Sequence, residues 1–443
     1  MDAAPAPVRS FASRHAPKLQ GGHTLGLLTS GQALFEAMAQ AMDQARSSIH
    51  LETYIFEFQG APLQVAEALE RAGARGISVR LLVDGIGTGA LPDDWQRRFR
   101  AAGVQWRVYE PLGKLGLLLP SRWRRLHRKL CVIDGVLGFC GGINLLDDYL
   151  GAGSAPLAHP RFDFALRCTG PLVSDMTEAL LQLWWRVLAL KRVRAHEFSA
   201  AWDALLATVS SASGPEYPGR ASGEGREVGR SGATDVRWFG QSAHAQAPPV
   251  VHDAPAMLVL RDNVWHRADI ERAYLKAIGE ARSEVLLANA YFVPGRRMRR
   301  ALVLAARRGV AVRVLLQGQY EGFMQYHAAR PVYQKLVDAG VDVREYTLSA
   351  LHAKVAVVDG AWATVGSSNL DPLSLLLAKE ANVVTADPAF AADLRQRLLH
   401  AMAHGATVLD HQALRNRPWQ QRVLDRLAFV VMRTLLWLTG HRY

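Results

Sequence analysis

Cysteine is scarce in this 443-residue chain, where it occurs only three times. Cys131, Cys140 and Cys168 show neither the short paired spacing of metal ligands nor the even number of a disulfide framework. We therefore expect a protein of a reducing compartment whose structure does not depend on cysteine pairs.

Long uninterrupted apolar runs are also missing. The opening stretch, MDAAPAPVRSFASRHAPKLQGG, contains basic residues but no continuous apolar segment, so we expect neither a secretory signal nor a spanning helix there. The apolar stretch from Leu427 to Leu438 is interrupted by Arg433 and is too short to cross a bilayer. The body of the protein is expected to stay on the cytosolic side.

Acidic residues are outnumbered by basic ones, with 40 Asp and Glu against 52 Lys and Arg, for a formal net charge of +12. Such a charge attracts anionic partners, and these include both nucleic acids and acidic membrane surfaces. The sign of the charge excludes neither class. The length and a hydrophobic content of 49% allow two ordinary cores.

An internal repeat is the strongest feature that is present. LHRKLCVIDGVLGFCGGINL from Leu126 is matched by LHAKVAVVDGAWATVGSSNL from Leu351, and GISVRLLVDG and ARSSIHLETYIF are matched by GVAVRVLLQG and ARSEVLLANAYF. Each copy alternates amphipathic helices with nearly continuous apolar strands, which predicts a sheet covered by helices on both faces. The expected fold class is α/β, with two tandem halves.

The composition divides the chain into five segments. Residues 1–25 form an N-terminal extension, and residues 26–205 form the first half. Residues 206–254 contain SSASGPEYPGRASGEGREVGRSGATD, which is rich in Gly, Ser, Pro and charge and is typical of a flexible linker. Residues 255–410 form the second half, and residues 411–443 form a C-terminal amphipathic helix that we expect to associate with a membrane.

Each copy of the motif predicts a β-hairpin with polar side chains on one face. In the first copy, the Asp-Gly pair that begins at Asp134 is a two-residue turn signal between LCVI and VLGFC. Such a turn places His127 opposite Gly142. Because side chains alternate along a strand, His127, Lys129 and Asn144 are then expected to project from the same side.

The second copy predicts the same arrangement around the turn that begins at Asp359. His352 is expected opposite Ser367, with Lys354 and Asn369 on the same face. Each half would then present one imidazole, one ammonium group and one amide together.

These residue types suit the cleavage of a phosphodiester. The reaction needs a nucleophile, a proton donor for the leaving oxygen and cations around the phosphoryl oxygens. Two histidines and two lysines supply all of these without a metal, so we expect no metal ion and no cofactor. A lone His or Lys in a strand is more often an ordinary core or surface residue, but chance explains two copies of one spacing poorly. Asp134 and Asp359 are assigned mainly to turn hydrogen bonding and local charge balance.

The double H-x-K-x4-D motif, followed by GGIN and GSSN, resembles the phospholipase D superfamily across both halves. RDNVWHRADIERAYLKAIGEARSEVLLANAYFVPG from Arg261 and RFDFALRCTGPLV from Arg161 are similar to bacterial cardiolipin synthases of type B. The resemblance implies two phospholipase D-like halves related by pseudo-twofold symmetry, with both motifs in one active site at their interface. It also implies a covalent phosphohistidine on one histidine, while the other acts as acid and then base.

The resemblance assigns a role to each matching position. His127 is expected to be the nucleophile and His352 the general acid, although the sequence alone leaves their order open. The expected catalytic set is His127, Lys129, Asp134, His352, Lys354 and Asp359. The expected phosphate-binding or supporting set is Asn144, Ser367, Asn369, Asp163 and Glu380.

Two carboxylates and one substitution refine this site. Asp163 in RFDF and Glu380 in KEAN stand where the family keeps an acidic residue that hydrogen-bonds the histidine and fixes its tautomer. The alternative is that they are ordinary solvated carboxylates. Gly142 in the first copy replaces Ser367 of the second, so the two phosphate pockets are not expected to be equivalent.

An insertion in the first half bears on the substrate. Gly103 and His127 are 24 positions apart, whereas Gly340 and His352 are 12 apart, so PLGKLGLLLPSRWRRLHRK carries 12 extra residues. Its leucines, tryptophan and basic residues suit a lip that touches acyl chains and headgroups. A packed loop is the alternative.

The C-terminal segment that begins at Trp419 predicts an interfacial helix. Arg422, Arg426 and Arg433 cluster on one side of a helical wheel, with an apolar arc opposite. A helix docked on the body of the protein is the alternative. The side chains expected to enter the acyl boundary are Leu427, Phe429, Val430, Leu436 and Trp437.

These features together predict a cardiolipin synthase, a phosphatidyltransferase that is peripheral on the cytoplasmic face of the cell membrane. Its partners would be anionic phospholipids and the membrane surface, with phosphatidylglycerol as the acceptor, and no nucleic acid is expected. A hydrolytic phospholipase D, phosphodiesterase or nuclease is the alternative enzyme. A nucleic-acid-binding module would explain the charge but would not require both His-Lys faces. The preferred donor and the oligomeric state are left open.

Overall fold

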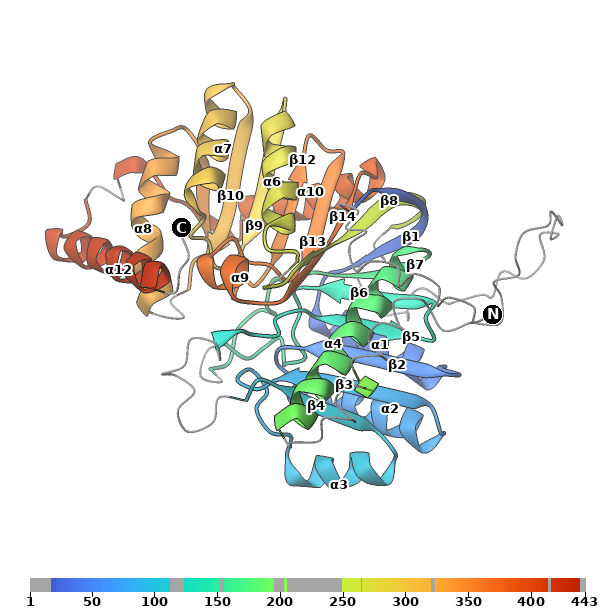
Figure 1. Ribbon diagram of the computed structural model, residues 1–443. Helices are drawn as coiled ribbons and strands as arrows, with labels where there is room; N and C mark the ends of the chain where they lie inside the picture. Colours follow the sequence, from blue (N-terminus) through green and yellow to red (C-terminus); the bar gives the residue numbers. More distant parts are fainter. Residues whose placement is uncertain are drawn as a thin grey trace, which may run out of the picture.

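Strands and helices alternate through the chain in the computed structural model, which describes residues 17–111, 123–151, 155–194, 203–204, 249–263, 265–319, 323–412 and 416–438 (Figure 1). The first half contains β1 (Gln20–Leu28), α1 (Gly31–Asp43), β2 (Ser48–Thr53), α2 (Leu63–Ala74), β3 (Ser78–Asp84), α3 (Asp93–Ala101), β4 (Gln105–Tyr109), β5 (Leu130–Ile133), β6 (Leu137–Gly141), β7 (Ala165–Thr169) and α4 (Leu172–Arg194).

The second half repeats this order of elements, with the short helix α9 inserted before β14 and with a strand and a helix added at its end. It contains β8 (Val250–Arg261), α6 (Asp269–Glu280), β9 (Glu284–Asn289), α7 (Arg296–Arg307), β10 (Ala311–Gln317), α8 (Phe323–Val337), β11 (Asp342–Tyr346), β12 (Lys354–Val358), β13 (Trp362–Gly366), α9 (Pro372–Leu376), β14 (Glu380–Thr385), α10 (Pro388–His404), β15 (Ala406–Val408) and α12 (Trp419–Leu438).

The strands of both halves form one continuous sheet of 15 strands, in the order β15-β11-β10-β9-β12-β13-β14-β8-β1-β7-β6-β5-β2-β3-β4. From the centre outward, each half has the same order, and the two halves join where β1 pairs antiparallel with β8. β2, β3 and β4 pair in parallel, as do β9, β10 and β11, whereas the motif strands pair antiparallel. The prediction of two α/β halves is confirmed.

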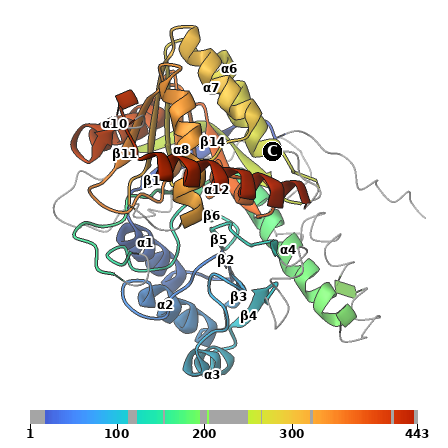
Figure 2. The ribbon, with the colours of Figure 1, turned by 90° about the vertical axis from the view of Figure 1, so that its left-hand side faces the viewer.

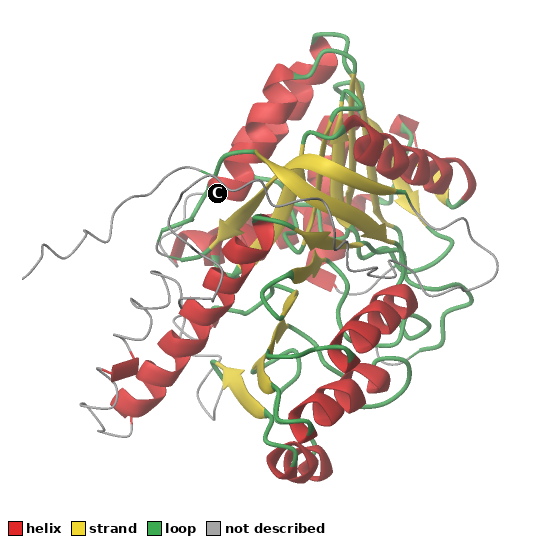
Figure 3. Ribbon diagram, turned by 90° about the vertical axis from the view of Figure 1, so that its right-hand side faces the viewer, coloured by secondary structure: helices red, strands yellow, loops and turns green. Residues whose placement is uncertain are grey.

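Helices cover both faces of the sheet (Figure 3). Successive residues of β5 alternate between two clusters: Cys131 packs with α1, α2 and α3, and Val132 packs with α4. The second of these clusters also contains Leu398 of α10, so it crosses from one half into the other. A third cluster joins α6, α7 and α8 to the second half of the sheet. Burial on both faces explains the nearly continuous apolar strands.

Glycines at equivalent positions set the connections from helix to strand. Gly76 follows α2 with φ 84°, and Gly309 follows α7 with φ 89°. This left-handed conformation favours glycine because it has no Cβ. The repeat in sequence is therefore also a repeat of backbone conformation.

The motif hairpins differ from the prediction by one residue in register. The turn itself is as predicted, because Asp134 has φ 52° and Val136 N donates a hydrogen bond to Ile133 O at 3.1 Å. However, Ile133 pairs with Leu137, which makes Val136 an extra, bulged residue. Lys129 O therefore accepts from Gly141 N, and the expected position of His127 opposite Gly142 is wrong.

The second hairpin has the same bulge. Val358 pairs with Trp362, which leaves Ala361 as the extra residue. The expected position of His352 opposite Ser367 is therefore wrong as well. Valine and alanine are ordinary strand residues, so nothing in the sequence marks either bulge.

The C-terminal helix α12 packs across α8 (Figure 2). Asp425 and Ala428 are buried, and Phe429 and Met432 pack against the core of the second half. The expectation that Phe429 enters a bilayer is therefore wrong, because this ring belongs to the docked face. Leu427 and Val430 are exposed, and the side chains of Leu436 and Trp437 lie outside the described residues.

Some expectations fall on parts of the chain that the structure does not describe. The leucine-rich part of the insertion lies in 112–122, and nearly all of the expected linker lies in 205–248. β1 and β8 begin a few residues before the expected starts of the halves at 26 and 255. In the described ranges, no helix has both the length and the apolar character needed to cross a membrane.

Candidate active site

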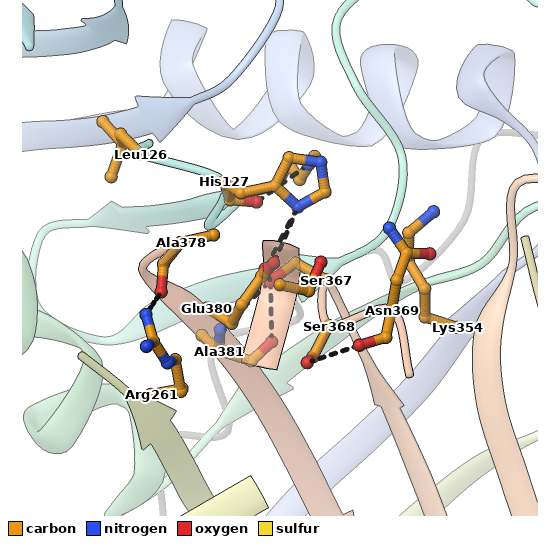
Figure 4. A network of polar contacts seen from close by, with 12 residues as sticks. Leu126, His127, Arg261, Lys354, Ser367, Ser368, Asn369, Ala378, Glu380 and Ala381 are labelled. Atoms are coloured by element: carbon orange, nitrogen blue, oxygen red, sulfur yellow. Dashed lines mark hydrogen bonds and ion pairs between the residues drawn. The ribbon is translucent and has the colours of Figure 1, made fainter. Parts of the chain in front are cut away.

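The segment that carries His127 is attached to the second half of the chain. His127 N donates to Lys379 O at 3.0 Å, and Lys379 N donates to Arg125 O at 2.8 Å. The next residue is Glu380, and its carboxylate oxygens Oε1 and Oε2 lie 3.0 Å and 3.1 Å from Nδ1 of His127 (Figure 4). Burial lowers the pKa of His127, although the charge of Glu380 acts in the opposite direction.

The segment that carries His352 is attached to the first half by the same pattern. His352 N donates to Phe162 O at 2.9 Å, and Phe162 N donates to Ala350 O at 2.9 Å. The next residue, Asp163, lies with Oδ2 at 2.7 Å from Nδ1 of His352. Burial also lowers the pKa of His352, well below its ordinary value.

Each half therefore supplies the carboxylate for the histidine of the other half. The sequence predicted one acidic residue for each histidine but did not say which residue pairs with which. A carboxylate on Nδ1 fixes the tautomer and leaves Nε2 as the reactive nitrogen. The side chains of His127 and His352 remain 14% and 11% exposed, whereas Glu380 and Asp163 are 0% and 2% exposed. A site built this way requires both halves.

The two motif lysines bring positive charge to this interface. Lys129 Nζ donates to the carbonyl of His127 at 2.8 Å, and Lys354 Nζ donates to the carbonyl of His352. Both lysine side chains are buried. Burial lowers the pKa of Lys129 to about 7. Within the described ranges, no group of three His, Cys, Asp or Glu side chains is arranged to hold a metal ion.

The two predicted amides are buried near the motifs. Asn144 is 6% exposed, and its Oδ1 has no hydrogen-bond partner. Asn369 is 3% exposed, and its Oδ1 lies 3.5 Å from Tyr291 N. Phosphate oxygens accept hydrogen bonds, so the Nδ2 groups of these amides, and not their Oδ1 atoms, are the donors that a bound phosphate could use.

Ser367 and Gly142 occupy equivalent positions beside the two carboxylates, but they act differently. The hydroxyl of Ser367 donates to Glu380 Oε2 at 2.5 Å (Figure 4). Gly142 has no side chain, and a Cβ there would lie 2.4 Å from Asp163 Oδ1. Glu380 therefore has a hydroxyl donor, whereas Asp163 packs directly against the backbone.

The two carboxyl groups also differ in their pKa values. Burial acts to raise the pKa of Glu380, but His127, Lys129 and the Ser367 hydroxyl hold this pKa below its ordinary value. Burial raises the pKa of Asp163 to about 7, and Lys354 opposes this only in part. Near neutral pH, Glu380 is therefore ionised, whereas Asp163 takes up a proton as the pH falls through about 7.

Asp134 and Asp359, the last residues of the two motifs, lie at the hairpin turns, beyond β5 and β12. The carboxylate of Asp134 accepts from the backbone N–H groups of residues 46, 47 and 48 and from the Ser47 hydroxyl. Asp359 does the same for residues 282, 283 and 284 and for the Ser283 hydroxyl. These contacts match the expected assignment to turn hydrogen bonding, and each aspartate anchors its hairpin to the start of a neighbouring strand.

Two polar residues that the sequence reasoning missed hold the segments before the histidines. Asp84, fully buried at the end of β3, accepts from Leu126 N at 2.8 Å and from Arg125 Nη1 at 3.1 Å. Gln317 has the equivalent position in β10 and accepts from Leu351 N at 3.2 Å. A polar residue ending each of two repeated apolar strands was the signal that could have identified them.

The first half also has a buried ion pair that was missed. Arg128 donates to Glu52 Oε2 from Nη2 at 2.7 Å and from Nε at 2.9 Å, with side-chain exposures of 7% and 2%. Ala353 and Ala288 occupy these positions in the second half. Tyr54 is also particular to the first half, with its ring 4.9 Å from that of His127.

Comparisons with known proteins agree with this geometry. The family model described as "Cardiolipin synthase, PLD-like domain" matches residues 38–152 and 274–402. The chain is 35% identical over 424 residues to cardiolipin synthase B of Escherichia coli strain K12. The matched region covers 95% of this chain and 91% of that protein. The chain is 29% identical over 403 residues to a cardiolipin synthase of Halalkalibacterium halodurans, which covers 90% of this chain and 70% of that protein.

A solved structure shares the fold at much lower sequence identity. Phosphatidylserine synthase from Haemophilus influenzae Rd KW20 superposes with a TM-score of 0.62 at 11% identity, covering 96% of this chain and 95% of that one. The matched segments of the family model contain His127 in the first half and His352 in the second. The chain belongs to the cardiolipin synthase family of phospholipase D-like proteins.

Proposed function

We propose that this protein synthesises cardiolipin by transferring a phosphatidyl group to phosphatidylglycerol through a phosphohistidine. The observation that carries the proposal is the crosswise pairing of His127 with Glu380 and of His352 with Asp163. It supplies two oriented imidazoles beside two lysines at one interface. The names of the relatives, which are cardiolipin synthases, support a lipid substrate.

In the first step, Nε2 of His127 attacks the phosphorus of the donor, and a P–N bond forms as the P–O bond to the leaving alcohol breaks. His352 delivers its proton to that leaving oxygen. Lys129 and Lys354 stabilise the charge on the phosphoryl oxygens, and Asn144 and Asn369 donate hydrogen bonds to them. Donors with the required phosphodiester include phosphatidylglycerol and cardiolipin itself.

In the second step, the hydroxyl of the acceptor phosphatidylglycerol loses its proton to His352 and attacks the phosphorus. A new P–O bond forms, the P–N bond to His127 breaks and the enzyme returns to its initial state. If water replaces the acceptor, the product is phosphatidic acid, so hydrolysis competes by the same route.

The surroundings of the two histidines support their separate roles. Glu380 is held ionised by His127, Lys129 and the Ser367 hydroxyl, and so stabilises the positive charge that develops on His127 as it attacks. Burial raises the pKa of Asp163 to about 7, so this carboxyl group can hold a proton beside His352, the group that must give and regain one. His127 is therefore assigned as the nucleophile and His352 as the acid and base.

The proposed setting is peripheral, on the cytoplasmic face of the membrane. A net charge of +12 suits an anionic phospholipid surface. Nucleic acid is also anionic and is the alternative substrate. The choice between lipid and DNA therefore needs a direct test.

The test is to incubate purified protein with phosphatidylglycerol in detergent micelles and, separately, with single- and double-stranded DNA. We expect cardiolipin and free glycerol from the lipid, with less phosphatidic acid than cardiolipin, and intact DNA. Cleavage of DNA without lipid turnover would overturn the proposal. Phosphatidic acid as the sole lipid product would make the protein a hydrolase.

A further inference from the structure

The outward side of α12 gathers exposed apolar side chains. Six of the 17 large hydrophobic residues that are exposed in the described ranges belong to this one helix. They are Trp419, Val423, Leu424, Leu427, Val430 and Val431. A contiguous apolar surface of this kind on a protein usually marks an interaction site.

The other side of α12 is already occupied, so these side chains do not belong to its packing face. Asp425 is 4% exposed and lies 2.6 Å from His327 Nδ1 of α8 and 3.0 Å from Arg417 Nη1. Ala428 and Phe429, one turn further on, pack inward with it. The helix is therefore held by one face and presents the opposite face to the outside.

The attachment of α12 places this outer face near the active-site end of the second half. α8, which carries His327, follows the carboxyl end of β10, where Gln317 accepts from the amide of Leu351. Leu351 directly precedes His352. Figure 2 shows α12 running across the front of α8, in the lower part of the second half.

Basic side chains lie at the border of the apolar surface. Arg422, Arg426 and Arg433 are all exposed. At about 100° per residue they fall on one stripe between the docked and the outer faces of the helix. An apolar surface beside a cationic stripe is the pattern of a helix that lies in a membrane interface.

We infer that the outer face of α12 rests on an anionic lipid bilayer and holds the active site at the membrane surface. The inference rests on the proposed function, which requires a lipid substrate, and it names the surface that reaches that substrate. Val423, Leu427 and Val430 enter the acyl boundary, while the arginine stripe meets the headgroups.

The experiment compares the triple variant Val423→Ser, Leu427→Ser, Val430→Ser with a matched control, Val136→Ser, Leu304→Ser, Val408→Ser, whose three apolar side chains are exposed elsewhere. Co-sedimentation is measured with vesicles of phosphatidylcholine alone and with vesicles in which about one lipid in three is phosphatidylglycerol, which gives an anionic surface. Turnover is measured on the same vesicles and on short-chain phosphatidylglycerol below its micellar concentration.

We expect the triple variant to lose at least about tenfold in vesicle binding and vesicle turnover, with short-chain turnover and melting temperature retained and the control unchanged. Each Arg→Gln change in the stripe should weaken binding about fivefold on anionic vesicles alone. Unchanged vesicle binding by the triple variant overturns the inference. A dimer in the wild type that the triple variant dissociates also overturns it, because a second copy would then cover this face. A wild type that binds vesicles but makes no cardiolipin from either substrate overturns the proposed function and leaves the binding surface standing.

Discussion

The two halves of this molecule share a backbone but differ in the chemistry beside their histidines. His127 of the first half has Glu380 on Nδ1, a carboxylate that also receives the Ser367 hydroxyl. His352 of the second half has Asp163, which packs against Gly142 without any hydroxyl. Because the carboxylates are exchanged between the halves, a change in one half alters the histidine of the other.

The halves also differ in how they hold their motifs. The first half has the buried Arg128–Glu52 ion pair, where the second has two alanines, Ala353 and Ala288. Duplicating one fold thus provides two similar frames, and a few substitutions give the two histidines the different surroundings that the proposed nucleophile and acid require. The two halves are therefore symmetric in their strands and asymmetric in their buried polar groups.

The largest effect should come from removing either histidine. His127→Ala and His352→Ala should each lower overall cardiolipin synthesis by about 10³-fold or more, because each step needs both a nucleophile and a proton carrier. Steady-state product formation by thin-layer chromatography measures this. A single variant that kept near-normal synthesis would contradict the two-histidine mechanism.

Replacing either carboxylate with its amide should give the next largest effect. Asp163→Asn should behave like His352→Ala, and Glu380→Gln like His127→Ala, with losses of about 10²- to 10⁴-fold, because the amide no longer holds the correct tautomer. Single-turnover kinetics with a donor that has a good leaving group separates them, since only Asp163→Asn should still release the alcohol. If Asp163→Asn instead blocked that release and Glu380→Gln did not, the assignment of roles would be reversed.

The sequence was sufficient to predict the two halves, because a repeated pattern of apolar strands and turn glycines such as Gly76 and Gly309 specifies local structure. It also identified both histidines and both carboxylates. The pairing of Glu380 with His127 was beyond it, since the partner of a side chain depends on how distant segments meet. The buried Arg128–Glu52 pair was missed for the same reason, because each residue alone is typical of a surface.

The ion pair of the first half can be tested by making it resemble the second half. Glu52→Ala should lower the free energy of unfolding by about 3–5 kcal/mol, because it leaves the buried guanidinium of Arg128 without its carboxylate. The double variant Glu52→Ala, Arg128→Ala should be destabilised less than the single one, since both charges are gone. Urea unfolding measures both. A double variant less stable than Glu52→Ala would refute this view of the pair.

A smaller effect is expected when the second half is given the glycine of the first. Ser367→Gly removes the hydroxyl donor of Glu380 and so raises the pKa of that carboxyl group, which then becomes protonated at a higher pH. The acidic limb of the kcat profile should move to higher pH, with about a tenfold loss near pH 5 and little change near pH 8.

The control for this variant is Ser349→Gly, which removes a buried hydroxyl that donates to the carbonyl of His159. The acidic limb of the kcat profile of Ser349→Gly should stay at the pH of the wild type. If Ser367→Gly gave the same limb as the wild type, the hydroxyl would not set the charge of Glu380.

The smallest effect on activity should come from the aspartates at the hairpin turns. Asp134→Asn and Asp359→Asn should each lower the free energy of unfolding by about 1–2 kcal/mol, with less than a twofold change in kcat. Burial acts to raise the pKa of Asp359, but backbone N–H groups and the Ser283 hydroxyl hold this pKa at about 2. This contribution to stability is therefore present above about pH 4, the unfolded value, and is lost as the pH falls towards 2.

Thermal unfolding between pH 2 and pH 7 measures that pH dependence, with Glu280→Gln, a change to an exposed carboxylate at the end of α6, as the control. Asp359→Asn should flatten the profile over this range. A large loss of kcat in either aspartate variant would instead indicate that the residue acts in catalysis.

We expect the two halves to divide the chemistry, with His127 as the nucleophile and His352 as the proton carrier. The most direct measurement is to incubate His352→Ala with a phosphatidyl donor that has a good leaving group, quench the reaction and locate the covalent adduct by peptide mass spectrometry. We expect a phosphatidyl group on His127 in His352→Ala, and no adduct in His127→Ala under the same conditions. An adduct on His352 in His127→Ala, with none on His127 in His352→Ala, would contradict this assignment of roles.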